Sequence, residues 1–92
     1  MENLQKLEMM DKILRELEDL KNSQTAVLKK LTQVEADNIT LGVGLLEKKL
    51  PDLHEQVDSS VEIVAGLLNE FQAYRDSFFS DKNLGDLQEP TA

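Results

Sequence analysis

Two rows of apolar residues run along most of this chain with the spacing of a coiled-coil helix. Alternating steps of three and four residues in the first half reach eleven positions, nine of them apolar: Met10, Ile13, Leu17, Leu20, Gln24, Val27, Leu31, Val34, Asn38, Leu41 and Leu45. A similar row in the second half has nine apolar members among ten: Leu46, Leu50, Leu53, Val57, Ser60, Val64, Leu67, Phe71, Tyr74 and Phe78. A mean step near 3.5 residues keeps such a row on one side of an α-helix that supercoils against another helix. The sequence therefore predicts an all-α protein with coiled-coil heptads.

The two rows differ in phase, so one straight seam cannot serve both halves of the chain. The change of phase falls in residues 37–44, where two glycines each cost a helix interior about 1 kcal/mol. Asn38 follows an aspartate there, and we expect it to be a turn or cap residue. We predict one helix over residues 3–36, a break over 37–44 and a second helix over 45–80. Pro51 lacks an amide donor and either opens the second helix or kinks it.

The matched lengths of the two helices favour a helical hairpin over residues 1–80, a single domain, followed by a disordered acidic tail over 81–92. Leu7, Leu14 and Leu28 lie beside the first row and widen its apolar face beyond what two helices need. We therefore expect homo-oligomerisation to complete the fold, as a four-helix bundle dimer or a trimeric bundle. The alternative is an extended, kinked parallel coiled coil.

Most members of the two rows are our candidates for the oligomerisation seam. Gln24 interrupts the first row and either fixes register and oligomeric state or lies in a loosened, hydrated layer. All the aromatic residues gather near the end of the second helix, where they either fill space against the start of the first helix or form an exposed docking patch. The predicted seam comprises Met10, Ile13, Leu17, Leu20, Gln24, Val27, Leu31, Val34, Leu53, Val57, Val64, Leu67, Phe71, Tyr74 and Phe78.

The acidic charge is concentrated in the second half. The net charge is −8, and residues 50–92 carry two Lys/Arg against nine Asp/Glu, whereas the first half is nearly balanced. Such a surface disfavours nucleic acid and anionic membrane as partners and is compatible with a basic protein. The alternative is a solvated face that keeps an assembly soluble. The possible partner-binding positions are Asp52, Glu55, Asp58, Glu62, Glu70 and Asp76.

The residues that carry chemistry in enzymes are sparse. The chain has no cysteine and one histidine, His54, which shares a helix face with Asp58. Two such ligands are fewer than a zinc site takes from protein, so we expect a solvated histidine, no metal and no cofactor. No nucleophile motif, zinc-protease motif or phosphate-binding loop is present. We expect a protein that is not an enzyme.

These observations predict a non-enzymatic protein–protein interaction module that associates with itself as a scaffold, adaptor or assembly subunit. A small acidic inhibitor that mimics nucleic acid and blocks a basic target is one alternative. A subunit of a hetero-oligomeric coiled-coil complex is another. The first residues lack the basic and apolar segments of a secretory signal, so we expect a soluble cytoplasmic protein, of a cell or of a virus or phage in its host.

Overall fold

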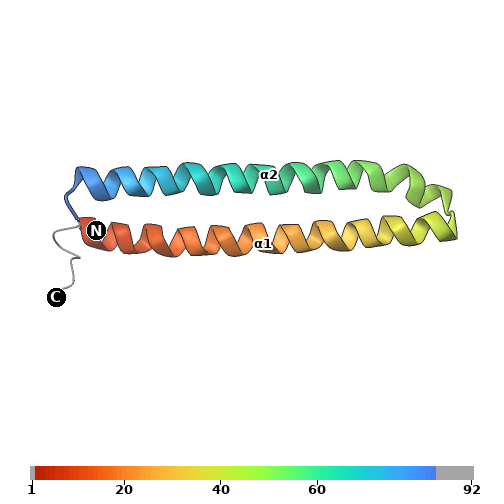
Figure 1. Ribbon diagram of the computed structural model, residues 1–92, viewed down its shortest axis with the longest axis horizontal. Helices are drawn as coiled ribbons and strands as arrows, with labels where there is room; N and C mark the ends of the chain where they lie inside the picture. The colour runs from red at the N-terminus through yellow and green to blue at the C-terminus, as the bar shows by residue number, and fades with distance from the viewer. Residues whose placement is uncertain (1, 85–92) are drawn as a thin grey trace.

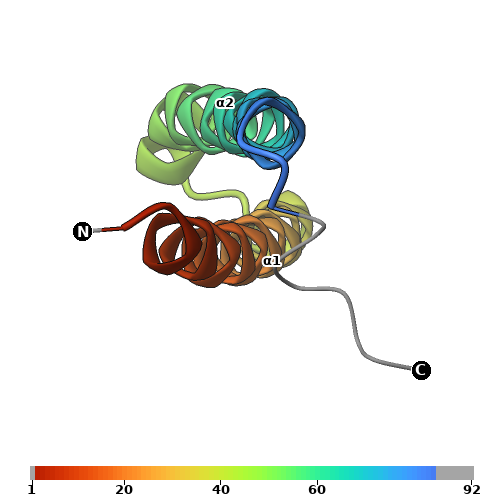
Figure 2. The ribbon, with the colours of Figure 1, turned by 90° about the vertical axis from the view of Figure 1, so that its left-hand side faces the viewer.

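The chain folds into two long antiparallel helices joined by a tight turn. The computed structural model describes residues 2–84, in which α1 spans Asn3–Leu41 and α2 spans Gly44–Asp81. The hairpin measures 63 × 23 × 19 Å, and the two helices lie side by side along its whole length (Figures 1 and 2). The described residues contain no strand. The all-α hairpin is confirmed, and the extended coiled coil is wrong for the single chain.

The turn is shorter than the sequence predicted. α1 continues through residues 37–41, and only Gly42 and Val43 separate the helices. Gly42 takes the left-handed conformation (φ 73°), which ends α1 at little cost because glycine has no Cβ. Asn38 lies within α1, and its side chain binds the turn residue Val43. Its Nδ2 donates to the Val43 carbonyl (3.2 Å) and its Oδ1 accepts from the Val43 amide (3.0 Å). The expected turn role of Asn38 is confirmed, but the break over 37–44 was placed too widely.

Pro51 lies within α2, which begins seven residues earlier at Gly44. Pro51 therefore does not open the helix. It has no amide hydrogen to donate to the carbonyl of Glu47, so one bond of the helical ladder is missing close to the start of α2. Figures 1 and 2 show the first turns of α2 bent toward α1, away from the line of the remaining helix.

The core is one thin seam between the helices. The seam is built from rows whose successive members are seven residues apart. These side chains are buried or half-buried: Leu7, Leu14, Leu17, Gln24, Leu28 and Leu31 on α1, and Leu50, Val57, Val61, Val64, Leu68, Phe71 and Phe78 on α2. Within residues 2–84, five apolar side chains fall below one-tenth exposure: Leu7, Leu31, Leu50, Val64 and Leu84. A core this small stabilises a chain of this length only modestly.

The residues after α2 close the open end of the hairpin. The amide of Leu84 donates to the Phe79 carbonyl (3.1 Å), and Asn83 adopts a left-handed conformation (φ 53°) that turns the chain back. Leu84 is 1% exposed and Leu7 of α1 is fully buried. The prediction of a disordered tail from residue 81 is therefore wrong for residues 81–84. Residues 85–92 lie outside the described part of the chain.

Candidate interaction surface

Each helix carries a row of apolar side chains that the hairpin leaves uncovered. On α1 the row is Ile13, Leu20, Val27 and Val34, and on α2 it is Leu53, Ser60, Leu67 and Tyr74. Successive members are seven residues apart, so each row follows one line along its helix. The exposed fractions of the apolar members range from 38% for Ile13 to 61% for Tyr74. Apolar surface is therefore exposed to water over three heptads of each helix, interrupted on α2 by Ser60.

The two rows share one face of the hairpin. Val27 of α1 and Leu53 of α2 line the same groove, together with Ser60. The antiparallel register places Ile13 level with Tyr74 and Leu20 level with Leu67, as the ion pair between Asp11 and Arg75 also requires. We call these two rows together the open face.

The predicted seam is divided between this face and the interior. Its alternate members pack between α1 and α2: Met10, Leu17, Gln24, Leu31, Val57, Val64, Phe71 and Phe78. The remaining members are the apolar residues of the open face. Two rows complete the intramolecular contact from the other side, and neither was assigned to the seam: Leu14, Lys21, Leu28 and Glu35 on α1, and His54, Val61, Leu68 and Arg75 on α2.

Polar bridges occupy the flank of the hairpin opposite the open face. Arg75 Nε donates to Asp11 Oδ1 (2.8 Å), and the hydrogen bonds to this carboxylate raise the pKa of Arg75. The guanidinium of Arg75 also lies 5.0 Å from the centre of the Phe79 ring. Near the turn, His54 Nδ1 and Glu35 Oε1 are 2.7 Å apart. These bridges join residues 64 and 19 positions apart, so no local pattern could have revealed them.

Gln24 forms a polar layer halfway along the seam. Its Nε2 donates to Ser60 Oγ (2.7 Å), while its Oε1 is buried and accepts no hydrogen bond. Exchanging the amide oxygen and nitrogen would let the Ser60 hydroxyl donate instead, and it would leave the amino group unpaired. In either orientation one buried amide atom lacks a partner among residues 2–84. Gln24 therefore links the core to the middle of the open face, where Ser60 interrupts the apolar row.

Five of the six candidate acidic residues lie on the outer surface of α2, and the sixth, Glu70, lies toward the edge of the open face. Asp52, Glu55, Asp58, Glu62, Glu70 and Asp76 are all exposed. Asp76 accepts hydrogen bonds from Gln72 (3.0 Å) and Arg75 (3.3 Å), both on its own helix. The six carboxylates do not converge on a common point, and among residues 2–84 no three potential metal ligands lie together.

The aromatic residues do not form one patch. Phe71, Phe78 and Phe79 are half-buried, whereas Tyr74 is exposed on the open face. The rings of Phe71 and Tyr74 are stacked, with centroids 6.1 Å apart and planes within 8° of parallel. Tyr74 is thereby held flat against a core residue.

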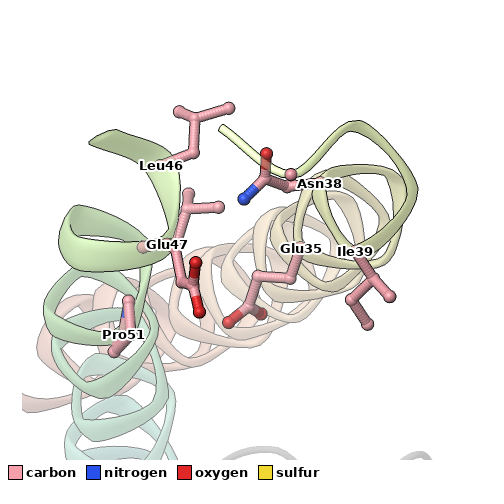
Figure 3. Close-up of a pocket in the computed structure, with 8 residues that line it drawn as sticks. Glu35, Asn38, Ile39, Leu46, Glu47 and Pro51 are labelled. Carbon is pink, nitrogen blue, oxygen red and sulfur yellow. The ribbon is translucent and has the colours of Figure 1, made fainter. Parts of the chain in front are cut away.

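A hollow lies beside the turn, with walls from both helices (Figure 3). Glu35, Asn38, Leu46, Glu47 and Pro51 line it. Two of its polar side chains are engaged, since Glu35 contacts His54 and Asn38 binds Val43. Figure 3 shows the carboxylate of Glu47 turned toward that of Glu35, so the remaining polar groups are of like charge. In the part of the chain that the structure describes, no helix is long and apolar enough to cross a membrane.

Comparison with known protein families, with curated proteins and with solved structures finds no match for this chain. The functional argument therefore depends on the geometry of the hairpin alone. Its most distinctive feature is the open face.

Proposed function

We propose that this protein is a non-enzymatic interaction module that assembles with a second copy of itself, so that two hairpins form a four-helix bundle. The observation that supports the proposal is the open face, with seven exposed apolar side chains in two parallel rows. Contiguous apolar surface of this kind marks interaction sites in soluble proteins. As an assembled unit the protein would serve as a scaffold or adaptor.

The size of the open face suits a stable dimer. The hairpin is 63 Å long and 23 Å across. A face of these dimensions offers on the order of 1,000 Å² per copy, which exceeds the roughly 800 Å² that each partner buries in an interface of standard size. Packing two such faces together would also give each thin intramolecular seam a second layer of apolar contacts.

The distribution of polar groups favours one closed dimer over an open-ended assembly. The flank opposite the open face carries the bridges Asp11–Arg75 and Glu35–His54. The acidic residues of α2 point outward from the seam. Among residues 2–84, the open face is the apolar surface that runs along the hairpin, whereas the exposed Ile39, Leu41 and Leu45 lie beside the turn. A self-complementary contact through the open face closes after two copies.

Sedimentation equilibrium on the wild type tests this proposal. We expect the mass of a dimer at micromolar concentration and a melting temperature that rises with protein concentration. A monomer at every concentration, or a trimer, would contradict it.

A pair of matched double variants locates the contact. Leu20→Gln with Leu67→Gln removes four leucines from the dimer interface. Each leucine is a little under half exposed in the hairpin, so its remaining burial contributes about 1 kcal/mol and the dimer should weaken roughly 100- to 1,000-fold. Ala26→Gln with Ala73→Gln places the same side chains on exposed outer positions and should leave the dimer unchanged.

A further inference from the structure

The open face determines how the second copy is oriented. We propose that the two hairpins pack with their turns at opposite ends, around a two-fold axis that passes close to Ser23 and Ile63. In this arrangement α1 lies against α1 of the second copy, and α2 against α2. The inference rests on the proposed function, because it requires the second copy to cover the open face.

Only two orientations let the open faces of two identical hairpins meet by a two-fold axis. The axis lies in the plane of the interface and runs either along the helices or across them. An axis along the helices places both turns at the same end and packs α1 against α2 of the second copy. An axis across the helices gives the arrangement proposed here. In both cases neighbouring helices are antiparallel, so the helix dipoles do not decide between them.

The apolar rows align well in the proposed arrangement. When the apolar rows are aligned, the helices overlap over nearly their whole length, and Leu20 lies level with Val27 of the second copy and Ile13 with its Val34. On α2, Leu53 lies level with Tyr74 of the second copy. The midpoint of the row on α1, between residues 23 and 24, lies within two residues of the midpoint of the helix at Asn22, so all four apolar residues of this row are used.

The residues at the outer edges of the open face distinguish the two orientations. On each helix an exposed row precedes the apolar row by four residues: Met9, Glu16, Ser23, Lys30 and Asp37 on α1, and Lys49, Gln56, Ile63, Glu70 and Ser77 on α2. With turns at opposite ends, Glu16 lies level with Lys30 of the second copy, twice by symmetry. With turns at the same end, Glu16 lies level with Glu70 of the second copy, which is a like-charge pair. In that orientation Asp37 also lies level with Lys49 of the second copy. The attraction between these opposite charges only offsets the repulsion between Glu16 and Glu70.

Ile63 gives an independent argument for the same orientation. It is 68% exposed although it belongs to neither the seam nor an apolar row. At the middle of the edge of α2, Ile63 meets Ile63 of the second copy across the proposed axis, and both become covered. In the other orientation it would lie against Ser23. The proposed arrangement therefore accounts for an isoleucine that the hairpin leaves in water.

Cysteine cross-linking tests the orientation directly, because the chain has no cysteine of its own. Under mild oxidation, Ser23→Cys should form a disulfide-linked dimer within minutes, and so should Ile63→Cys. Ser59→Cys, on the outer surface of α2, is the control and should remain unlinked. The opposite orientation predicts that neither variant links alone and that an equimolar mixture of the two does. That result would overturn the proposal.

A charge reversal gives a second test that needs no cross-link. Glu16→Lys should weaken the wild-type dimer roughly two- to tenfold, because two opposite pairs become like pairs, and Glu16→Lys with Lys30→Glu should restore it. In the opposite orientation Glu16→Lys faces Glu70 and tightens the dimer, which would refute the proposed arrangement. A wild type that sediments as a monomer would refute the dimer itself. The two failures are therefore distinguishable.

Discussion

Replacing Gln24 by leucine should stabilise the hairpin. The substitution removes a buried amide that has one hydrogen bond, to Ser60, and one atom without a partner. A typical intramolecular hydrogen bond contributes about 1 kcal/mol net, whereas an unpaired buried polar atom costs about 1–3 kcal/mol. Leucine has a similar size and adds apolar contact with the seam. The difference gives an expected gain of about 1 kcal/mol per chain in the free energy of unfolding.

Urea unfolding, followed by circular dichroism at fixed protein concentration, measures this change. The paired variant Ser60→Ala removes the partner of Gln24 and should cost about 1 kcal/mol in the wild-type background. In the Gln24→Leu background, Ser60→Ala should leave the free energy of unfolding unchanged, since Ser60 no longer accepts a hydrogen bond from an amide. A Gln24→Leu protein that is less stable than the wild type would refute the reasoning and show that the amide is fully paired in the assembly. A change of sedimenting mass would show that Gln24 specifies the oligomeric state.

Three further substitutions probe the bridges, the turn and the acidic surface. Arg75→Gln should lower the free energy of unfolding by about 1–2 kcal/mol, because it breaks a bidentate bridge between the helices, and urea unfolding at low and high salt should show the loss shrinking as salt screens the pair. Gly42→Ala should cost about 1 kcal/mol through its left-handed φ, whereas Gly44→Ala, with open space around its Cα, should be neutral or stabilising in thermal melts. Asp58→Lys with Glu62→Lys should leave the sedimenting mass and helicity unchanged, since both residues lie on the outer surface; dissociation would show that the interface includes that surface.

The sequence predicts the hairpin because its signals are local. Heptad spacing, two glycines separated by one residue and an asparagine before them are enough to indicate two helices and a turn. The end of α1 was predicted five residues early because Asp37–Leu41 contain turn-forming residue types, yet Asn38 reaches Val43 without leaving the helix. The capping partner lies beyond Gly42, so α1 continues through Leu41 while Asn38 still binds the turn.

The partition between seam and open face could not be predicted in the same way. Three adjacent rows on α1, those of Leu14, Leu17 and Leu20, all have heptad spacing and mostly apolar members. Which two rows turn inward depends on the rotation of α1 against α2, and this is set by long-range pairs such as Asp11–Arg75. Lys21 and Glu35 are polar, so the sequence does not indicate that their row, which also contains Leu14 and Leu28, packs between the helices. Side-chain pairing between helices therefore supplies the information that periodicity lacks.

The return of the chain at Leu84 would make the proposed dimer a molecular ruler. Because the chain after α2 comes back to the start of α1, the first and last described residues lie at one end of a hairpin 63 Å long (Figure 1). Two hairpins with opposed turns would hold whatever is attached to these ends about one hairpin length apart, at opposite poles of a rod. Fluorophores on Asn3 of each copy should therefore report a separation of about 60 Å by energy transfer, set by the length of α1 at 1.5 Å per residue. The proposed dimer would therefore hold two attached groups at a fixed distance.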